Sequence, residues 1–153
     1  MKTNASWTGG FQRFDDALTR LRQALERGPS ALTQLEKEGV IYRFEWCLEL
    51  SWKTTRDFLE DSGLVVAPVT PREVFRQASV TGTVRDGQVW IDMLNHRTHL
   101  AHSADGVVLA EVVDALSQRY LAAMEELREF LAARSHEELP AGEAAASPAI
   151  RLG

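Results

Sequence analysis

The chain has 153 residues and a formal net charge of −5, with 44% hydrophobic and 25% charged residues. This length suits one domain with a core of its own. The acidic balance argues against a protein that coats nucleic acid non-specifically, because such proteins need a basic face that releases counterions. No stretch is apolar enough to span a bilayer, and the single cysteine, Cys47, cannot form a disulfide framework. We therefore expect a cytoplasmic protein that is not tied to a membrane.

The first half of the chain predicts two helices. Apolar residues recur at helical spacing before Gly28-Pro29 stops the first helix, and they are Phe11, Phe14, Leu18, Leu21 and Leu25. Thr33 and Glu36 form a capping-box pattern, so a second helix begins near residue 33 and runs to about residue 61. Its interior is an apolar stripe made of Val40, Ile41, Phe44, Leu48, Trp52, Thr55 and Leu59.

The second half predicts three further helices. Residues 70–73, Thr-Pro-Arg-Glu, are a start signal with proline at the first helical position, and they predict a short helix over 71–80. Another helix starts after Asp86-Gly87, and the last covers about 105–133. No alternating strand pattern competes with these assignments. Short connections between amphipathic helices predict an all-α fold, an antiparallel bundle of about five helices.

The composition changes near the C-terminal end of the chain. From residue 135 onward Ala, Glu, Pro, Gly and Ser dominate, and large apolar side chains are scarce. We therefore expect a flexible N-terminus over 1–8, one helical domain over 9–134 and a disordered tail over 135–153.

Residues 95–102, Asn-His-Arg-Thr-His-Leu-Ala-His, hold three of the chain's four histidines beside an arginine. As a metal site, His96, His99 and His102 would lie at i, i+3 and i+6 of a helix, with Asp92 one turn earlier. Helical metal sites more often combine an i, i+4 pair with ligands from another element. We therefore predict no metal and no cofactor. For His96 and His99 separately, a hydrogen-bonded structural role is the better interpretation.

Arg97 and His102 allow a different interpretation. Five residues separate them, which places them about 140° apart on a continuous α-helix. A joint site requires the helix to end or bend between them, or two chains to supply the groups, and residues 103–106 do form a break signal. Such a pair suits metal-free cleavage of RNA, because the imidazole moves protons and the guanidinium stabilises charge on the phosphorus oxygens.

The spacing of Arg97 and His102 matches the arginine-x4-histidine motif of the HEPN superfamily. Three further segments resemble the nucleotidyltransferase substrate-binding branch of that superfamily, and they are residues 39–53, 71–74 and 82–94. Together these matches cover residues 9–133 in the right order. The chain is therefore identified as a member of that branch by resemblance, with an all-helical bundle as the implied fold.

The resemblance implies a homodimer in which two pairs of Arg97 and His102 face one another in a shared cleft. Members of this branch are usually encoded beside a small nucleotidyltransferase, which acts as the antitoxin to a ribonuclease toxin. We therefore expect a metal-independent endoribonuclease that acts on RNA, with Arg97, His102 and Thr98 as catalytic residues. Thr98 stands where the family commonly has asparagine, aspartate or histidine. The alternative is a non-catalytic adaptor that binds substrate for the nucleotidyltransferase.

Control by the partner is expected to differ from one known pattern. In some pairs the nucleotidyltransferase attaches AMP to a tyrosine two residues after the motif histidine, and this chain has Ala104 there. A methyl group cannot accept AMP. We therefore expect the partner to cover the cleft, or to modify another hydroxyl such as that of Thr98 or Ser103.

The second predicted helix carries charged residues whose role is open. Glu45, Glu49 and Lys53 are spaced i, i+4, i+8, so Glu49 and Lys53 can pair along the helix. With Trp46 and Trp52 nearby, this face suits a partner surface, but a solvated helix face is the commoner outcome. None of these residues is predicted to belong to the site.

Overall fold

The computed structural model describes the backbone of residues 5–103 and 105–146, and the side chains of residues 7–103 and 105–135. Within these residues the structure contains helices and no strand, which confirms the predicted all-α class. In chain order the elements are α1 (Ala5–Ala24), the short 3-10 helix η1 (Pro29–Ala31), α2 (Gln34–Asp61), α3 (Pro71–Val80), α4 (Gly87–Ala101), α5 (Gly106–Ala115), the π-helical turn η2 (Leu116–Tyr120) and α6 (Leu121–Ala146).

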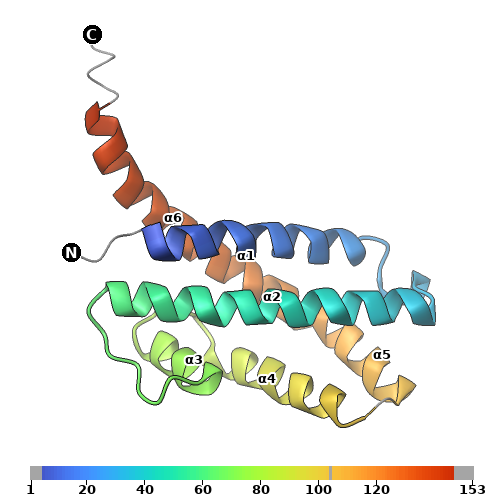
Figure 1. Ribbon diagram of the computed structural model, residues 1–153. Helices are drawn as coiled ribbons and strands as arrows, with labels where there is room; N and C mark the ends of the chain where they lie inside the picture. The colour runs from blue at the N-terminus through green and yellow to red at the C-terminus, as the bar shows by residue number, and fades with distance from the viewer. Residues whose placement is uncertain (1–4, 104, 147–153) are drawn as a thin grey trace.

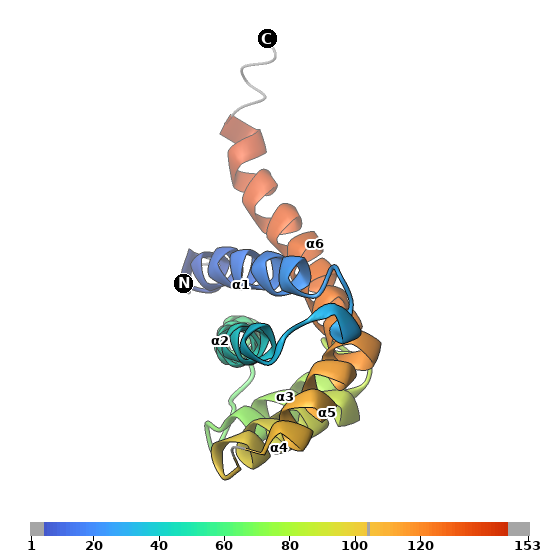
Figure 2. The same ribbon diagram turned by 90° about the vertical axis from the view of Figure 1, so that its right-hand side faces the viewer.

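The helices form an antiparallel arrangement around α2. Figure 1 shows α1 and α2 side by side in opposite directions, with α3 and α4 on the other side of α2. The view turned by 90° shows α5 and α6 crossing one side of these helices (Figure 2). The opposite side of α2 remains uncovered.

Side-chain caps set the starts of the helices at the predicted places. Thr33 Oγ1 accepts a hydrogen bond from the Glu36 amide at 3.1 Å, and Glu36 Oε1 accepts one from the Thr33 amide at 2.9 Å. This capping box begins α2. Thr70 and Asp86 likewise cap α3 and α4 by accepting from backbone amides of the first turn. Each cap contributes about 1 kcal/mol to helix stability.

The core is one cluster of buried side chains to which all six α-helices and η2 contribute. Its largest fully buried side chains include Trp7, Phe14 and Leu18 from α1, Phe44 and Leu48 from α2, and Leu116 and Tyr120 from η2. Complete burial of a leucine or phenylalanine side chain contributes about 1.5–3 kcal/mol. Cys47 is also fully buried, and its burial raises the pKa of the thiol. Trp52, predicted to lie in the same apolar stripe, is only partly buried because it sits at the edge of that stripe.

The last helix differs from its predicted form. The sequence predicts one helix over about 105–133, whereas the structure has α5 and α6 joined by the π-helical turn η2. A π turn adds one residue to a helical turn, so it shifts which side chains face the core. Tyr120, the last residue of this turn, is fully buried and stacks on Phe44 with ring centroids 6.1 Å apart.

The C-terminal part of α6 also differs from expectation. α6 continues to Ala146, past the predicted domain boundary at residue 134, and Figure 1 shows its end projecting beyond the other helices. Ala, Leu and Glu are strong helix formers and supply most of residues 135–146, whereas Pro140 and Gly142 in the same stretch disfavour a helix. The remaining predicted tail, residues 147–153, lies outside the described residues, as do residues 1–4 of the predicted flexible N-terminus. Residues 5–8, which were also expected to be flexible, form the first turn of α1.

Candidate functional site

The motif-bearing helix α4 ends only after the whole segment between Arg97 and His102. Its last residue is Ala101, and His102 is the C-cap residue, with φ −108°, ψ 4° and its amide donating to the His99 carbonyl at 3.1 Å. The predicted helix break therefore follows the motif and does not divide it. In the described part of the chain, no hydrogen bond or ion pair joins the two side chains. One chain alone does not bring the predicted pair together.

Arg97 instead reaches across to α2. Its Nη1 lies 3.5 Å from Oε1 of Glu49, and its side chain is 30% exposed. Glu49 also receives hydrogen bonds from Lys53 Nζ at 2.9 Å and from Trp52 Nε1 at 3.1 Å. Burial acts to raise the pKa of Glu49, but these hydrogen bonds and the charges of Lys53 and Arg97 outweigh it, and the pKa falls below 4.5. The predicted Glu49–Lys53 pair is confirmed.

The charge of Arg97 also affects the pKa of a second carboxylate of α2, that of Glu45. Glu45 lies one turn before Glu49 and is partly buried. Burial raises the pKa of Glu45 above its usual 4.5, while the charge of Arg97 acts in the opposite direction. Sequence reasoning treated both glutamates as a solvated helix face and missed their relation to Arg97. Their i, i+4 spacing was a visible signal, but nothing in the sequence indicates which helix packs against that face.

Thr98 has no contact that ties it to Arg97 or His102. Its hydroxyl donates to the Leu94 carbonyl of the same helix at 3.1 Å. This bond satisfies the donor locally, while the hydroxyl oxygen can still accept a hydrogen bond. Thr98, His99 and His102 are all exposed to solvent.

His96 has the structural role that the sequence favours for it. Its Nδ1 lies 2.7 Å from the Tyr120 hydroxyl, and its Nε2 lies 3.3 Å from Oε2 of Glu111. A neutral imidazole with its proton on Nε2 satisfies both contacts, because Nδ1 then accepts from the tyrosine and Nε2–H donates to the carboxylate. His96 thus connects α4 to both α5 and η2.

Two of the four residues of the considered metal site, Asp92 and His96, are bound to other partners. Asp92 accepts hydrogen bonds from Arg119 at 2.8 Å and from Gln88 at 2.9 Å, while His96 is bound to Tyr120 and Glu111. Across residues 7–103 and 105–135, no group of three or more His, Cys, Asp or Glu side chains is arranged to hold a metal ion.

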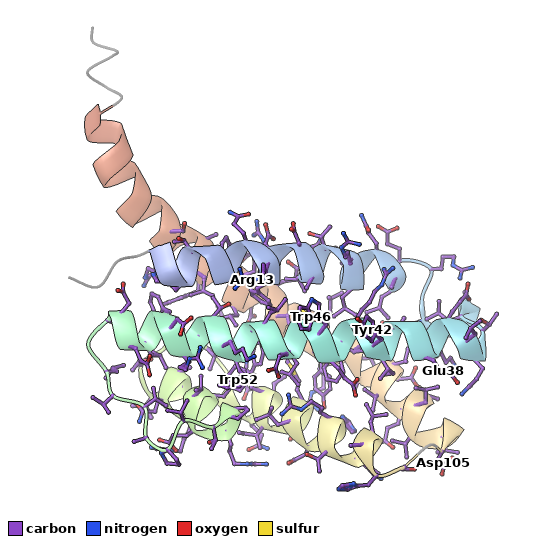
Figure 3. The ribbon with its side chains drawn as sticks, viewed as in Figure 1. Arg13, Glu38, Tyr42, Trp46, Trp52 and Asp105 are labelled. Atoms are coloured by element: carbon purple, nitrogen blue, oxygen red, sulfur yellow. The ribbon has the colours of Figure 1, made fainter. Side chains whose placement is uncertain are left out.

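A cavity of about 270 Å³ adjoins the end of α4, and it is lined by Gln34, Glu38, Ile41, Glu45, Leu100, Ser103, Asp105 and Leu109. Its charged lining groups are all carboxylates, from Glu38, Glu45 and Asp105. Figure 3 shows Glu38 on α2 and Asp105 at the start of α5. An acidic cavity repels phosphate, so a phosphodiester near His102 has to approach from another side.

Residues 10–133 match the model of a family described as nucleotidyltransferase substrate binding protein like. The match covers most of the chain, and the protein belongs to this family. A search of curated proteins finds no match to this sequence. None of the described helices has both the length and the apolar character needed to cross a bilayer.

Proposed function

We propose that this protein is the substrate-binding partner of a nucleotidyltransferase. The observation that carries this proposal is the family match over residues 10–133. The surroundings of Arg97 support it, because the guanidinium is paired with Glu49 and forms no hydrogen bond to His102 among the described residues. A binding role needs exposed recognition groups and does not need the two motif residues to meet.

The family resemblance implies a small nucleotidyltransferase encoded beside this protein, and co-expression with that partner tests this function. An affinity tag on the nucleotidyltransferase should retain the helical protein through purification and gel filtration, with a constant ratio of the two chains across the peak. A nucleotidyltransferase of similar size from an unrelated operon serves as the control and should retain nothing. Separate elution of the two partners at micromolar concentrations contradicts the proposal.

The second candidate function is metal-independent endoribonuclease activity, as in a toxin–antitoxin pair. The observation that favours it is the exposure of both motif side chains at one end of the bundle: His102 projects from the end of α4, and Arg97 is partly open one turn earlier. In this proposal a homodimer supplies Arg97 and His102 from facing copies to one phosphate. Thr98 contributes a hydrogen bond to the same substrate.

RNA cleavage by purified protein tests this second function. His102→Ala and Arg97→Ala should each slow cleavage of total RNA by about 10² to 10⁴, and cleavage by the unaltered protein should persist in EDTA. His99→Ala is the matched control, because His99 is an exposed imidazole on the same helix. If His99→Ala and His102→Ala slow RNA cleavage by the same factor, the assignment of His102 as the catalytic histidine is contradicted. Absence of cleavage by the unaltered protein leaves only the binding function.

We propose that the nucleotidyltransferase controls this protein by binding over Arg97 and His102 and so covering them. Ala104, which replaces the family tyrosine, lies outside the described residues, but its side chain carries no hydroxyl. Thr98 and Ser103 are the nearby hydroxyls. Mass spectrometry of the co-expressed protein should find residues 95–105 unmodified in a stoichiometric complex. AMP on Thr98 or Ser103 contradicts control by covering alone.

A further inference from the structure

Two large aromatic side chains of α2 lie open to solvent beside α1. Tyr42 is 72% exposed and Trp46 is 52% exposed. They are four residues apart, so they lie on one face of α2, about 6 Å apart along the helix axis. Figure 3 shows both near the junction of α2 with α1, on the uncovered side of the bundle. No ring contact joins them among the described aromatic side chains, so the ring faces are free to stack on other groups.

The surface beside these rings is concave and positively charged. A cavity of about 420 Å³ lies between α1 and α2, and it is lined by Ala17, Arg20, Tyr42, Arg43 and Trp46. The two arginines are its only charged lining groups. Arg43 Nη1 donates to the Arg20 backbone carbonyl at 2.9 Å, which holds the guanidinium against α1. Within the described residues, neither arginine forms an ion pair with a carboxylate.

Arg20 and Arg43 belong to a minority of the described arginines that form no ion pair, together with Arg13, Arg72 and Arg134. Elsewhere in the described chain, carboxylates pair with Arg22, Arg27, Arg56, Arg76, Arg85, Arg97, Arg119 and Arg128. The chain carries a net charge of −5, so carboxylates are plentiful. Two unpaired guanidinium groups beside two exposed rings therefore form a surface that complements an anion with flat apolar parts.

We propose that this α1–α2 face binds single-stranded RNA. Bases stack on Trp46 and Tyr42, and the guanidinium groups of Arg20 and Arg43 contact the phosphates. The inference rests on the proposed function and deepens it by naming the class of substrate. Single strands are favoured over duplexes, because only unpaired bases present their faces to aromatic side chains.

The same face of α2 leads from the aromatic rings toward the motif. Glu49 lies three residues after Trp46, nearly on the same side of the helix, and it contacts Arg97 of α4. An RNA strand along α2 that stacks on Trp46 therefore comes close to Arg97. The chain thus places a base-stacking surface and the motif arginine on one continuous face.

A protein partner is the competing occupant, since interfaces between proteins are also rich in Tyr, Trp and Arg. The centre of a stable protein interface is apolar and depleted of charge. Here the groove between α1 and α2 holds two cations, Arg20 and Arg43. Their positive charge favours a polyanion with separate stacking bases.

Fluorescence anisotropy with a labelled oligouridine tests the proposal. All measurements use His102→Ala protein, so that the probe stays intact whether or not the protein cuts RNA. Trp46→Ala and Tyr42→Ala should each weaken binding of the single strand by about fivefold to a hundredfold. The double variant Arg20→Ala/Arg43→Ala should weaken binding and flatten its dependence on salt. An RNA hairpin should bind more weakly than the single strand.

Val80→Ala and Arg85→Ala are the matched controls, because Val80 is 77% exposed and the Arg85 side chain 81% exposed, away from this face. Both variants should bind oligouridine with the same affinity as the His102→Ala protein that carries no further change. If Trp46→Ala binds oligouridine with unchanged affinity, the inference is overturned. It is also overturned if light scattering shows that Trp46→Ala dissociates a dimer, because the face is then a contact between protein chains. No binding by the starting protein also overturns it. These measurements omit the nucleotidyltransferase, so failure here is separate from failure of co-purification.

Discussion

The Arg97 guanidinium lies 3.5 Å from a Glu49 carboxylate oxygen and thereby joins the motif-bearing helix α4 to α2. The Arg97 and Glu49 side chains are 30% and 33% exposed, respectively. Ion pairs with such exposure contribute about 0–1 kcal/mol. A phosphate that offers two oxygens to the guanidinium can therefore replace the carboxylate. Glu49 competes with a phosphate ligand for Arg97 and does not block it.

This competition predicts tighter RNA binding when the carboxylate is removed. Glu49→Gln keeps one acceptor oxygen, which can still bind Trp52 Nε1, but it removes the oxygen that pairs with Lys53 and the negative charge beside Arg97. The affinity for oligouridine should rise by about twofold to fivefold, in line with an exposed ion pair. Glu60→Gln removes one charge from an exposed site of the same helix and is the matched control. If the affinity for oligouridine rises equally in both variants, the change in net charge is the cause. Weaker binding by Glu49→Gln contradicts competition between Glu49 and phosphate for Arg97.

Glu45→Gln should stabilise the protein at neutral pH. Burial raises the pKa of Glu45 above 4.5, so the native state holds this proton more tightly than the unfolded state. As pH rises through 4.5 the unfolded state ionises first, and the native state loses relative stability until its own pKa is passed. The amide removes this loss. Thermal unfolding should show a higher midpoint for Glu45→Gln at neutral pH and equal midpoints below pH 4.5. A constant difference at every pH excludes titration as the cause.

Tyr120→Phe should weaken the contact that fixes α4. The change removes the 2.7 Å hydrogen bond to His96 Nδ1 and leaves the buried ring in place. We expect the free energy of unfolding in urea to fall by about 1 kcal/mol. Tyr42→Phe is the matched control, because that hydroxyl is on an exposed side chain, and its effect should be close to zero. Equal effects of the two changes contradict a specific role for the His96–Tyr120 bond.

The same tyrosine predicts a loss of stability in alkali. Burial, with a smaller contribution from the charge of Asp92, raises the pKa of Tyr120 to about 12 from the ordinary 10.0. The unfolded state therefore ionises first, and stability falls as the pH rises from about 10 to about 12. Tyr120→Phe should unfold at a midpoint that depends less on pH across this window. Parallel curves for both proteins contradict the assignment.

Neighbouring glycines in α1 should respond to alanine with opposite signs. A Cβ at Gly10 lies 2.9 Å from Oγ1 of Thr54, whose side chain is almost fully buried, whereas a Cβ at Gly9 meets nothing within 4 Å. Gly10→Ala should lower the free energy of unfolding by about 1–3 kcal/mol, because α1 and α2 must move apart. Gly9→Ala should raise it by up to about 1 kcal/mol through helix propensity. Chemical denaturation measures both, and stabilisation by Gly10→Ala contradicts the close approach.

The ribonuclease candidate predicts a dimer. Arg97 and His102 do not meet within one chain, so a shared site needs a second copy. Light scattering should give the mass of two chains at micromolar concentration, and substitution of charge on exposed residues of α4, such as Asn95→Lys, should reduce that mass to one chain. A monomer in the unaltered protein removes the composite site and leaves the binding function.

Local chemistry explains why much of the fold was predictable. The starts of α2, α3 and α4 depend on a capping residue and the amides of the next turn, and all three were predicted from short patterns at Thr33, Thr70 and Asp86. The all-α class follows from apolar spacing, which is also local. The π-helical turn was not predictable in this way, because it depends on where Tyr120 meets Phe44 and His96 in the packed bundle.

The candidate site likewise has features that follow from local sequence and features that depend on the packing of the helices. The sequence by itself determined the motif pair Arg97 and His102 and the family resemblance, because these depend on residue types at fixed spacing. It favoured a structural role for His96 but did not indicate the partners Tyr120 and Glu111. Only the tertiary structure decided that Glu49 lies beside Arg97 and that Tyr42 and Trp46 remain uncovered next to α1. The physical reason is that the neighbours of a helix face come from other helices. Their identity depends on how whole helices pack, and no local pattern in one helix specifies it.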